Sequence, residues 1–332
     1  MRKLLFAAVA ALSAMVTLAE PVKVIFDTDM YTDFDDVGAL ACLHALADAG
    51  ECEILGTIIC SRGTPGLGMI EIMNHFYGRP ELPVGVNKKL GLGPLERGWV
   101  GYCIYRDLVN ANPKLVKHPT SDTAPDAPLV YRMLLAAQPD GSVTIISVGL
   151  TSNLRRLLET KPDAVSRLDG KTLVAKKVKA WYAMATRYPE GFEFNSSTDG
   201  ESSRICFAEW PTPIYFADFH IGNGIKTGLP VAALDDKFNP VRDVFKRALR
   251  DCKEETKGHS SFDQVAVLAG VRGWERYYEV ERGRMAIIDE KGNNRWTKDD
   301  AGNHYVLREK TPKAEIAKII DELMAKAPKA RK

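Results

Sequence analysis

The sequence lacks an excess of charge of either sign. Its 45 basic side chains nearly balance its 43 acidic ones, and without residues 1–19 both numbers are 43. Proteins that bind nucleic acids or anionic membranes usually carry a clear basic excess. The composition therefore argues against nucleic acid and membrane as partners, and it leaves a small-molecule ligand open.

Beyond residue 19 the chain also lacks a long uncharged apolar stretch that could cross a membrane. Residues 1–19 begin with Arg2 and Lys3, continue with an apolar run from Leu4 to Leu12, and end at Ala19. These three parts are typical of a secretory signal, although a buried N-terminal helix is the alternative. We expect residues 1–19 to be a signal peptide and residues 20–332 to be one periplasmic or secreted domain.

Cysteine is sparse, and its six residues include no Cys-x-x-Cys pair. This spacing gives no support to a zinc site. Disulfides would be compatible with an oxidising compartment. However, Cys42, Cys60 and Cys206 lie in apolar runs, which are typical of buried free thiols.

Acidic residues, in contrast, are concentrated after the first apolar run. Five carboxylates occur within ten residues: Asp27, Asp29, Asp33, Asp35 and Asp36. Two like charges about 4 Å apart repel by ~1 kcal/mol in water and by ~4 kcal/mol at an effective dielectric near 20. Such a cluster at the end of a buried strand holds either protons or a cation, and dense oxygen ligation suits calcium before magnesium. The alternative is a solvated loop with a helix cap, which explains only one or two of the five.

Apolar strands alternate with helices over most of the chain. We predict a strand in the apolar run that reaches Phe26 and further strands near 53–60, 83–86, 143–148, 178–185 and 213–219, with helices at 37–47, 67–77, 127–137 and 239–252. This order predicts an α/β fold with one open, mostly parallel sheet flanked by helices, and ligands at the carboxyl ends of its strands. The pattern from 277 to 307 predicts a small C-terminal β-hairpin region, followed by a helix over 312–327.

The stretch 88–125 has no clear periodicity and interleaves glycines with Trp99, Tyr102 and Tyr105. It is either an ordinary surface loop with some core aromatics or a mobile flap whose rings stack on a flat heterocycle.

Four separated segments resemble, in the same order, motifs of the inosine–uridine-preferring nucleoside hydrolase family. They are Asp27-Thr28-Asp29 with Asp35-Asp36, Gly149-Leu150-Thr151-Ser152-Asn153, Glu193-Phe194-Asn195, and Asp263 at the start of an apolar helix. The resemblance implies a calcium-dependent enzyme that splits the N-glycosidic bond of a ribonucleoside, or a related ribosyl compound, into free base and ribose.

The resemblance also implies roles for individual residues. Calcium would be held by the carboxylates of Asp29, Asp36 and Asp263 and by the backbone carbonyl of Ser152. Asp29 would act as the catalytic base that removes a proton from the attacking water. The ribose hydroxyls would be bound by Asp35, Glu193 and Asn195, which supply acceptors and an amide. Asp27 would contact and orient these residues without binding the metal or the substrate itself. Asp33 has no implied role.

The chain departs from the family at Phe262, where many members carry a histidine that is proposed to protonate the leaving base. Loss of a general acid lowers the rate by roughly 10² to 10⁴ where the leaving group needs a proton. His259 is close enough in sequence to replace it, unless it is a solvated loop residue. Stacking on Trp99, Tyr102 or Phe262 could instead raise the proton affinity of the base.

Two other functions remain open. A haloacid-dehalogenase-like phosphatase also begins with an apolar strand and Asp-x-Asp, with Asp27 as nucleophile, Asp29 as acid and magnesium as cofactor. A secreted binding protein could retain the calcium and ribose contacts without turnover, as Phe262 suggests. In every case the expected partner is a small molecule, and a homo-oligomer is compatible with the sequence.

Overall fold

The computed structural model describes residues 20–63, 65–92 and 99–329. The predicted signal peptide, residues 1–19, lies outside these ranges. No helix within them is both long enough and apolar enough to cross a membrane.

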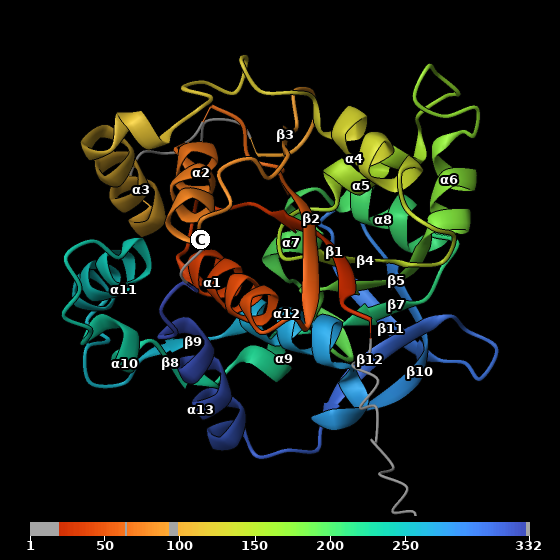
Figure 1. Cartoon of the computed structure of the whole chain (residues 1–332). Helices are drawn as coiled ribbons and strands as arrows, with labels where there is room; N and C mark the ends of the chain where they lie inside the picture. Colours follow the sequence, from red (N-terminus) through yellow and green to blue (C-terminus); the bar gives the residue numbers. More distant parts are fainter. Residues whose placement is uncertain (1–19, 64, 93–98, 330–332) are drawn as a thin grey trace, which may run out of the picture.

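A ten-stranded sheet runs through the middle of the molecule (Figure 1). Its strands lie in the order β3 (Val84–Val86), β2 (Cys52–Ile59), β1 (Val22–Thr28), β4 (Val143–Ser147), β5 (Val178–Ala183), β7 (Ile214–Phe216), β12 (His304–Glu309), β10 (Tyr278–Ile287), β11 (Asn294–Lys298) and β6 (Glu190–Gly191). The seven strands from β3 to β12 pair in parallel, and the last three continue the sheet in antiparallel fashion. The mostly parallel open sheet predicted from the sequence is confirmed.

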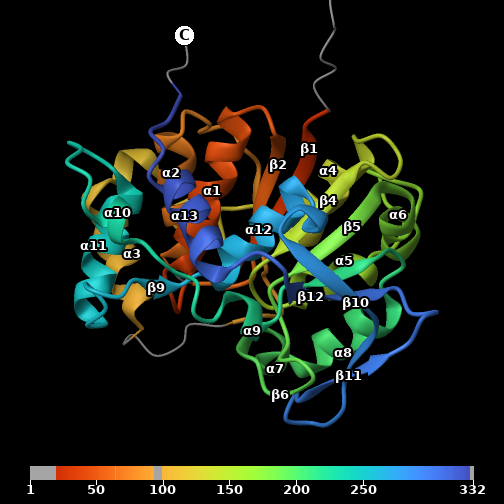
Figure 2. The same ribbon diagram turned by 90° about the horizontal axis from the view of Figure 1, so that it is seen from below.

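Helices cover both faces of the sheet, and the two views of the ribbon separate them (Figures 1 and 2). One layer contains α1 (Asp35–Asp48), α2 (Gly66–Phe76), α12 (Phe262–Arg272) and α13 (Lys313–Met324), with α3 (Val100–Ala111) and α11 (Pro240–Asp251) at its outer side. The other layer contains α4 (Ala127–Ala136), α5 (Ser152–Leu158), α6 (Gly170–Lys177) and α8 (Gly200–Glu209). Shorter elements complete the chain: η1 (Pro113–Leu115), α7 (Phe194–Thr198), α9 (Phe219–Gly222), β8 (Lys226–Thr227), α10 (Leu229–Ala232), β9 (His259–Ser260) and η2 (Trp274–Arg276).

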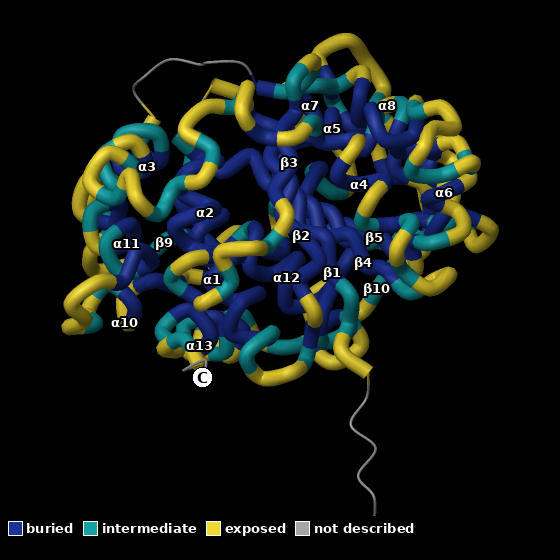
Figure 3. Tube along the Cα trace, turned by 45° about the horizontal axis from the view of Figure 1, so that its top comes forward, coloured by how far each residue is buried: buried dark blue, intermediate teal, exposed yellow. Residues whose placement is uncertain are grey.

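The central strands are apolar throughout because each of their faces packs against helices. In β1, Val24 and Phe26 join the core beneath α1 and α12, whereas Ile25 joins the core on the opposite face. The tube in Figure 3 shows the result, with the strands buried at the centre and exposed segments around the rim.

The strand order reverses at β1, because β2 and β3 extend to one side of it and β4 and β5 to the other. In open parallel sheets, the loops that leave such a reversal diverge at the carboxyl ends of the strands and create a ligand-binding crevice. Asp29 follows the carboxyl end of β1, so the fold places the acidic stretch at this point.

Two details differ from the sequence-based expectation. Residues 100–111, predicted to be irregular, form α3, whose apolar side packs onto the core through Ile104 and Tyr105. The predicted C-terminal hairpin region exists, but its strands β10, β11 and β12 belong to the main sheet.

Candidate active site

The carboxylates at the crevice come from two distant parts of the chain. Asp29 follows β1, Asp35 and Asp36 lie in the first turn of α1, and Asp263 lies in the first turn of α12. The N-termini of α1 and α12 therefore point toward the same place, and their partial positive charge stabilises carboxylates there.

Asp35, Asp36 and Asp263 each direct a carboxylate oxygen to within 4.8 Å of the others. All three are buried, as is Asp29, and none is more than 4% exposed. Thr28 donates a hydroxyl hydrogen bond to Asp36, and the backbone N–H of Asp263 donates to Asp35 Oδ2 at 3.3 Å. These bonds fix the direction in which the carboxylates point.

Burial, followed by repulsion from neighbouring carboxylates, raises the pKa of Asp29, Asp35, Asp36 and Asp263 well above the usual range. Among the described residues, no lysine or arginine forms an ion pair with any of the four. Apart from His259, the described part of the chain supplies no ion-paired cation beside these acids, so the donor set fits a bound metal ion. Carboxylate oxygens suit a hard divalent cation.

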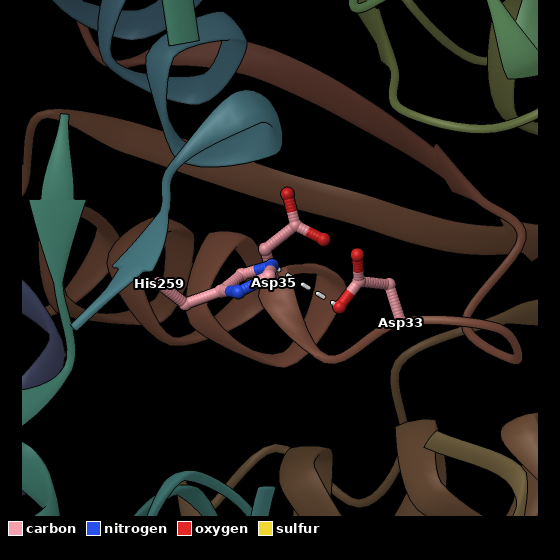
Figure 4. A group of neighbouring side chains, drawn as sticks. All are labelled: Asp33, Asp35 and His259. Carbon is pink, nitrogen blue, oxygen red and sulfur yellow. Dashed lines mark ion pairs between the residues drawn. The ribbon is translucent and has the colours of Figure 1, made fainter. Parts of the chain in front are cut away.

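Asp33 lies at the rim of the cluster and pairs with His259 of β9 (Figure 4). The distance from His259 Nε2 to Asp33 Oδ1 is 3.3 Å, and that from Nδ1 to Glu254 Oε2 is 2.7 Å. Burial alone would lower the pKa of His259, but the ion pair with Asp33 and the surrounding acids raise it to about 9. The imidazole rests on the ring of Phe34 at 4.2 Å between centroids. The imidazole of His259 is thus positively charged and fixed in position by its contacts. It is not a solvated loop residue.

These acids line a cavity of about 480 Å³. Its volume is in the usual range for small-molecule sites. The other side chains that line it, apart from the acids of the cluster and His259, are Thr32, Trp99, Val100, Val148, Met184, Arg187, Phe192, Glu193, Phe194, Asn195, Phe219, Cys252 and Phe262.

Glu193 and Asn195 line this cavity as well, at the start of α7. Glu193 Oε1 accepts the N–H of Asn195 at 2.9 Å, and Oε2 accepts the N–H groups of Thr186 and Ser196. Burial raises the pKa of Glu193, and these backbone donors oppose the rise. Asn195 Nδ2 donates to the carbonyls of Val148 and Met184, both at 3.1 Å, which leaves its Oδ1 as an acceptor.

Ser152, predicted to offer a carbonyl, does not line the cavity in the described part of the chain. It begins α5, and its Oγ accepts a hydrogen bond from Asn87 Nδ2 at 3.2 Å. Val148, directly after the carboxyl end of β4, lines the cavity instead. The assignment of the Ser152 carbonyl as a metal ligand stays a prediction.

Asp27 is fully buried and turned away from the cavity. It accepts the hydroxyl of Tyr131 at 2.6 Å and the amide of Asn153 at 2.9 Å. A carboxylate in this position cannot reach a substrate, which removes the phosphatase alternative with Asp27 as nucleophile.

Aromatic rings form another part of the cavity wall. Phe219 and Phe262 stack with centroids 5.2 Å apart, and Trp99 lies 6.4 Å from Phe194. Trp99 and Phe192 remain 44% and 52% exposed at the mouth. Tyr102 is not part of the wall and packs edge-on against Tyr31. Phe192, Phe219 and Arg187 escaped the sequence analysis because no short motif marks residues that meet only through the fold.

No protein-family model matches the sequence, and no curated protein matches it in a sequence comparison. Solved structures do resemble it. A plant nucleoside hydrolase, PpNRh1, has a TM-score of 0.69 at 20% identity, covering 92% of this chain and 99% of that one. The inosine–uridine-preferring nucleoside hydrolase from Bacillus anthracis has a TM-score of 0.67 at 16% identity, covering 92% and 99%.

The type III effector protein XopQ, solved as a complex with adenosine diphosphate ribose, has a TM-score of 0.66 at 14% identity and covers 93% of each chain. At such low identities the likeness concerns architecture. The chain has the nucleoside hydrolase fold, with a buried aspartate cluster at the carboxyl ends of its central strands.

Proposed function

We propose that the protein hydrolyses the N-glycosidic bond of a ribonucleoside or a related ribosyl compound, with calcium bound at the aspartate cluster. The observation that carries this proposal is the meeting of Asp35, Asp36 and Asp263 in one cavity with Glu193 and Asn195. The fold shared with two nucleoside hydrolases and with an effector solved with adenosine diphosphate ribose supports it.

The metal would be held by Asp29, Asp36 and Asp263, with a backbone carbonyl of the turn that follows β4 as a further ligand. Oxygen donors on separate elements suit calcium, which accepts six to eight loosely arranged ligands. When bound, calcium would keep the surrounding acids ionised and would bind and orient the attacking water.

Asp29 is the proposed base that takes the proton from this water, since it follows β1 and lines the cavity. Asp35, Glu193 and Asn195 would bind the ribose hydroxyls. One lone pair of Glu193 Oε1 and the Oδ1 of Asn195 remain available as acceptors for them. The sugar becomes oxocarbenium-like as its bond to the base breaks, and the fixed carboxylates stabilise the positive charge that develops.

The leaving base needs a proton or a strongly polarising environment. His259 lines the cavity as a charged imidazole, and it is the proposed proton donor in place of the histidine absent at Phe262. The stacked rings of Phe219 and Phe262 offer a flat apolar surface on which a base can lie.

The test is an assay of ribose release from inosine, uridine and adenosine, with added calcium and with a chelator. Release that stops with the chelator supports the proposal. Stabilisation of the protein by ribose without any release would instead identify a binding protein, which is the second candidate motivated by Phe262. Failure of both release and binding would overturn the proposed function.

A further inference from the structure

Arg187 lines the acidic cavity, yet its guanidinium forms no ion pair with a carboxylate among the residues that the structure describes. Its Nε donates to the carbonyl of Phe192 at 3.0 Å, and its Cζ lies 4.0 Å from the centre of the Phe219 ring. Within the described ranges, these two contacts leave the Nη1 and Nη2 groups without a protein acceptor. A guanidinium that only balanced the nearby acids would pair with one of them.

The backbone around Arg187 is held in place from several directions. Asn294, fully buried, accepts the N–H of Arg187 and donates to its carbonyl, both at 2.8 Å. Thr186 has φ of 77°, a conformation that a β-branched residue rarely adopts, and its N–H is bound by Glu193. Strain of this kind persists where surrounding contacts over-determine it, which is common at ligand sites.

The result is a guanidinium with a fixed position and free terminal donors. Its Nε side is occupied by a backbone carbonyl and one of its faces by an aromatic ring. The remaining Nη groups form a planar fork, which matches two oxygens of a phosphate better than a neutral hydroxyl. Because ribosyl compounds carry their negative charge on phosphate groups, a phosphate attached to the sugar is the ligand that this fork fits.

We propose that Arg187 recognises a phosphate on the substrate, so that phosphorylated ribosyl compounds are preferred over plain nucleosides. This inference rests on the proposed function and specifies its substrate class. It explains why a cation is fixed in the wall of a cavity whose other charged side chains are mostly acids.

The test compares phosphorylated and unphosphorylated ligands on the full calcium-loaded chain. Binding of ribose 5-phosphate, adenosine diphosphate ribose and ribose is measured by calorimetry, and kcat/KM is measured for inosine and inosine 5′-monophosphate. Charged hydrogen bonds of this kind correspond to a preference of about 10- to 100-fold for the phosphorylated compound. The two phosphorylated ligands distinguish a monoester from a diphosphate.

In Arg187→Met the ratio between phosphorylated and unphosphorylated ligands should fall to near one, and in Arg187→Lys it should fall only in part. Arg295→Met is the matched control, since Arg295 is exposed and pairs with Glu190 outside the cavity. Circular dichroism establishes that each variant is folded, and Arg187→Gln replaces the methionine variant if that one is not.

Three outcomes are distinguishable. A wild-type preference that Arg187→Met abolishes and Arg295→Met retains supports the inference, whether it appears in turnover or in binding alone. Cleavage of inosine without any advantage of phosphate, or with a ratio unchanged by Arg187→Met, overturns the inference and leaves the proposed function intact. Neither binding nor cleavage of any ribosyl compound overturns both.

Discussion

Asp29 combines two proposed tasks, a metal contact and the removal of a proton from water. In Asp29→Asn the side chain keeps its size but can no longer accept that proton, so we expect kcat to fall by roughly 10² to 10⁴. Ribose release at saturating substrate measures the effect. The control is Asp235→Asn, an exposed aspartate outside the cavity. A variant with near wild-type kcat would exclude Asp29 as the base.

The contribution of His259 to kcat/KM should be largest for substrates whose leaving group needs a proton. We expect His259→Gln to lower kcat/KM for inosine by roughly 10² to 10⁴. With 4-nitrophenyl riboside, whose leaving group departs as a stable anion, the loss should be small. Equal losses on both substrates would show that the imidazole acts only by holding Asp33 and Glu254 in place.

His304, at the start of β12, is not among the residues that line the cavity, and it gives the protein a pH-dependent stability. Burial, with help from the charge of Arg284, lowers its pKa to about 4, and its Nδ1 accepts the N–H of Met285 at 2.9 Å. Between pH 6.5 and 4 the unfolded chain binds a proton that the folded chain excludes, so stability is present above this window and is lost as pH falls through it.

We therefore expect the free energy of unfolding to fall less between pH 7 and pH 5 in His304→Gln than in wild type. The difference between the two decreases should be roughly 1 to 2 kcal/mol. Urea unfolding at the two pH values measures the difference. All other titrating groups are common to both proteins and cancel in the comparison. An equal decrease in the free energy of unfolding in both proteins would contradict the role assigned to His304.

At the scale of elements, the turn between β4 and α5 packs closely against the backbone at the start of the acidic loop. A Cβ on Gly149 would lie 2.5 Å from the backbone nitrogen of Asp29 and 2.8 Å from the carbonyl carbon of Thr28. Since backbone atoms cannot give way easily, Gly149→Ala should displace Asp29 and lower ribose release by at least tenfold.

Gly141→Ala is the matched control for that change, because Gly141 precedes the same strand and its Cβ would meet nothing within 4 Å. Its φ of 60° means a strain of about 1 kcal/mol in the alanine variant, without a shift at the site. Activity unchanged in Gly149→Ala would show that the loop tolerates the displacement.

The elements were predictable from the sequence to different degrees. The unit from β1 to α1 was found because an apolar run, a dense acidic segment and a helical run follow one another. Helix α3 was missed because glycines and aromatics hide its periodicity, and its identity depends on packing against Tyr31 and Asp33. A motif match near Ser152 located the turn between β4 and α5, whose residue Val148 lines the cavity.

The contacts of Arg187 and His259 could not have been predicted at all. Arg187 is fixed by Asn294, 107 residues away, and His259 meets Asp33 across more than 200 residues. No local pattern carries such pairings, because they arise only when α9, β9 and β11 are brought beside the central strands.

For the whole molecule, calcium should act as a stabilising ligand. Binding to the folded state alone adds about 2.7 kcal/mol at a free calcium concentration 100 times the Kd, which corresponds to a rise in Tm of several degrees. Chelation should reverse this rise in wild type and have no effect in Asp263→Asn. Thermal unfolding followed by circular dichroism measures both, and a Tm independent of calcium in wild type would contradict the assigned ion.

The two helices that converge on the carboxylates begin at residues 35 and 262. A ribosome therefore makes most of the polypeptide before the last acid of the proposed centre exists, and a fragment that stops before α12 lacks one of the proposed ligands, Asp263. Calcium uptake by the proposed centre would therefore report that the chain has been made and folded at least as far as the start of α12.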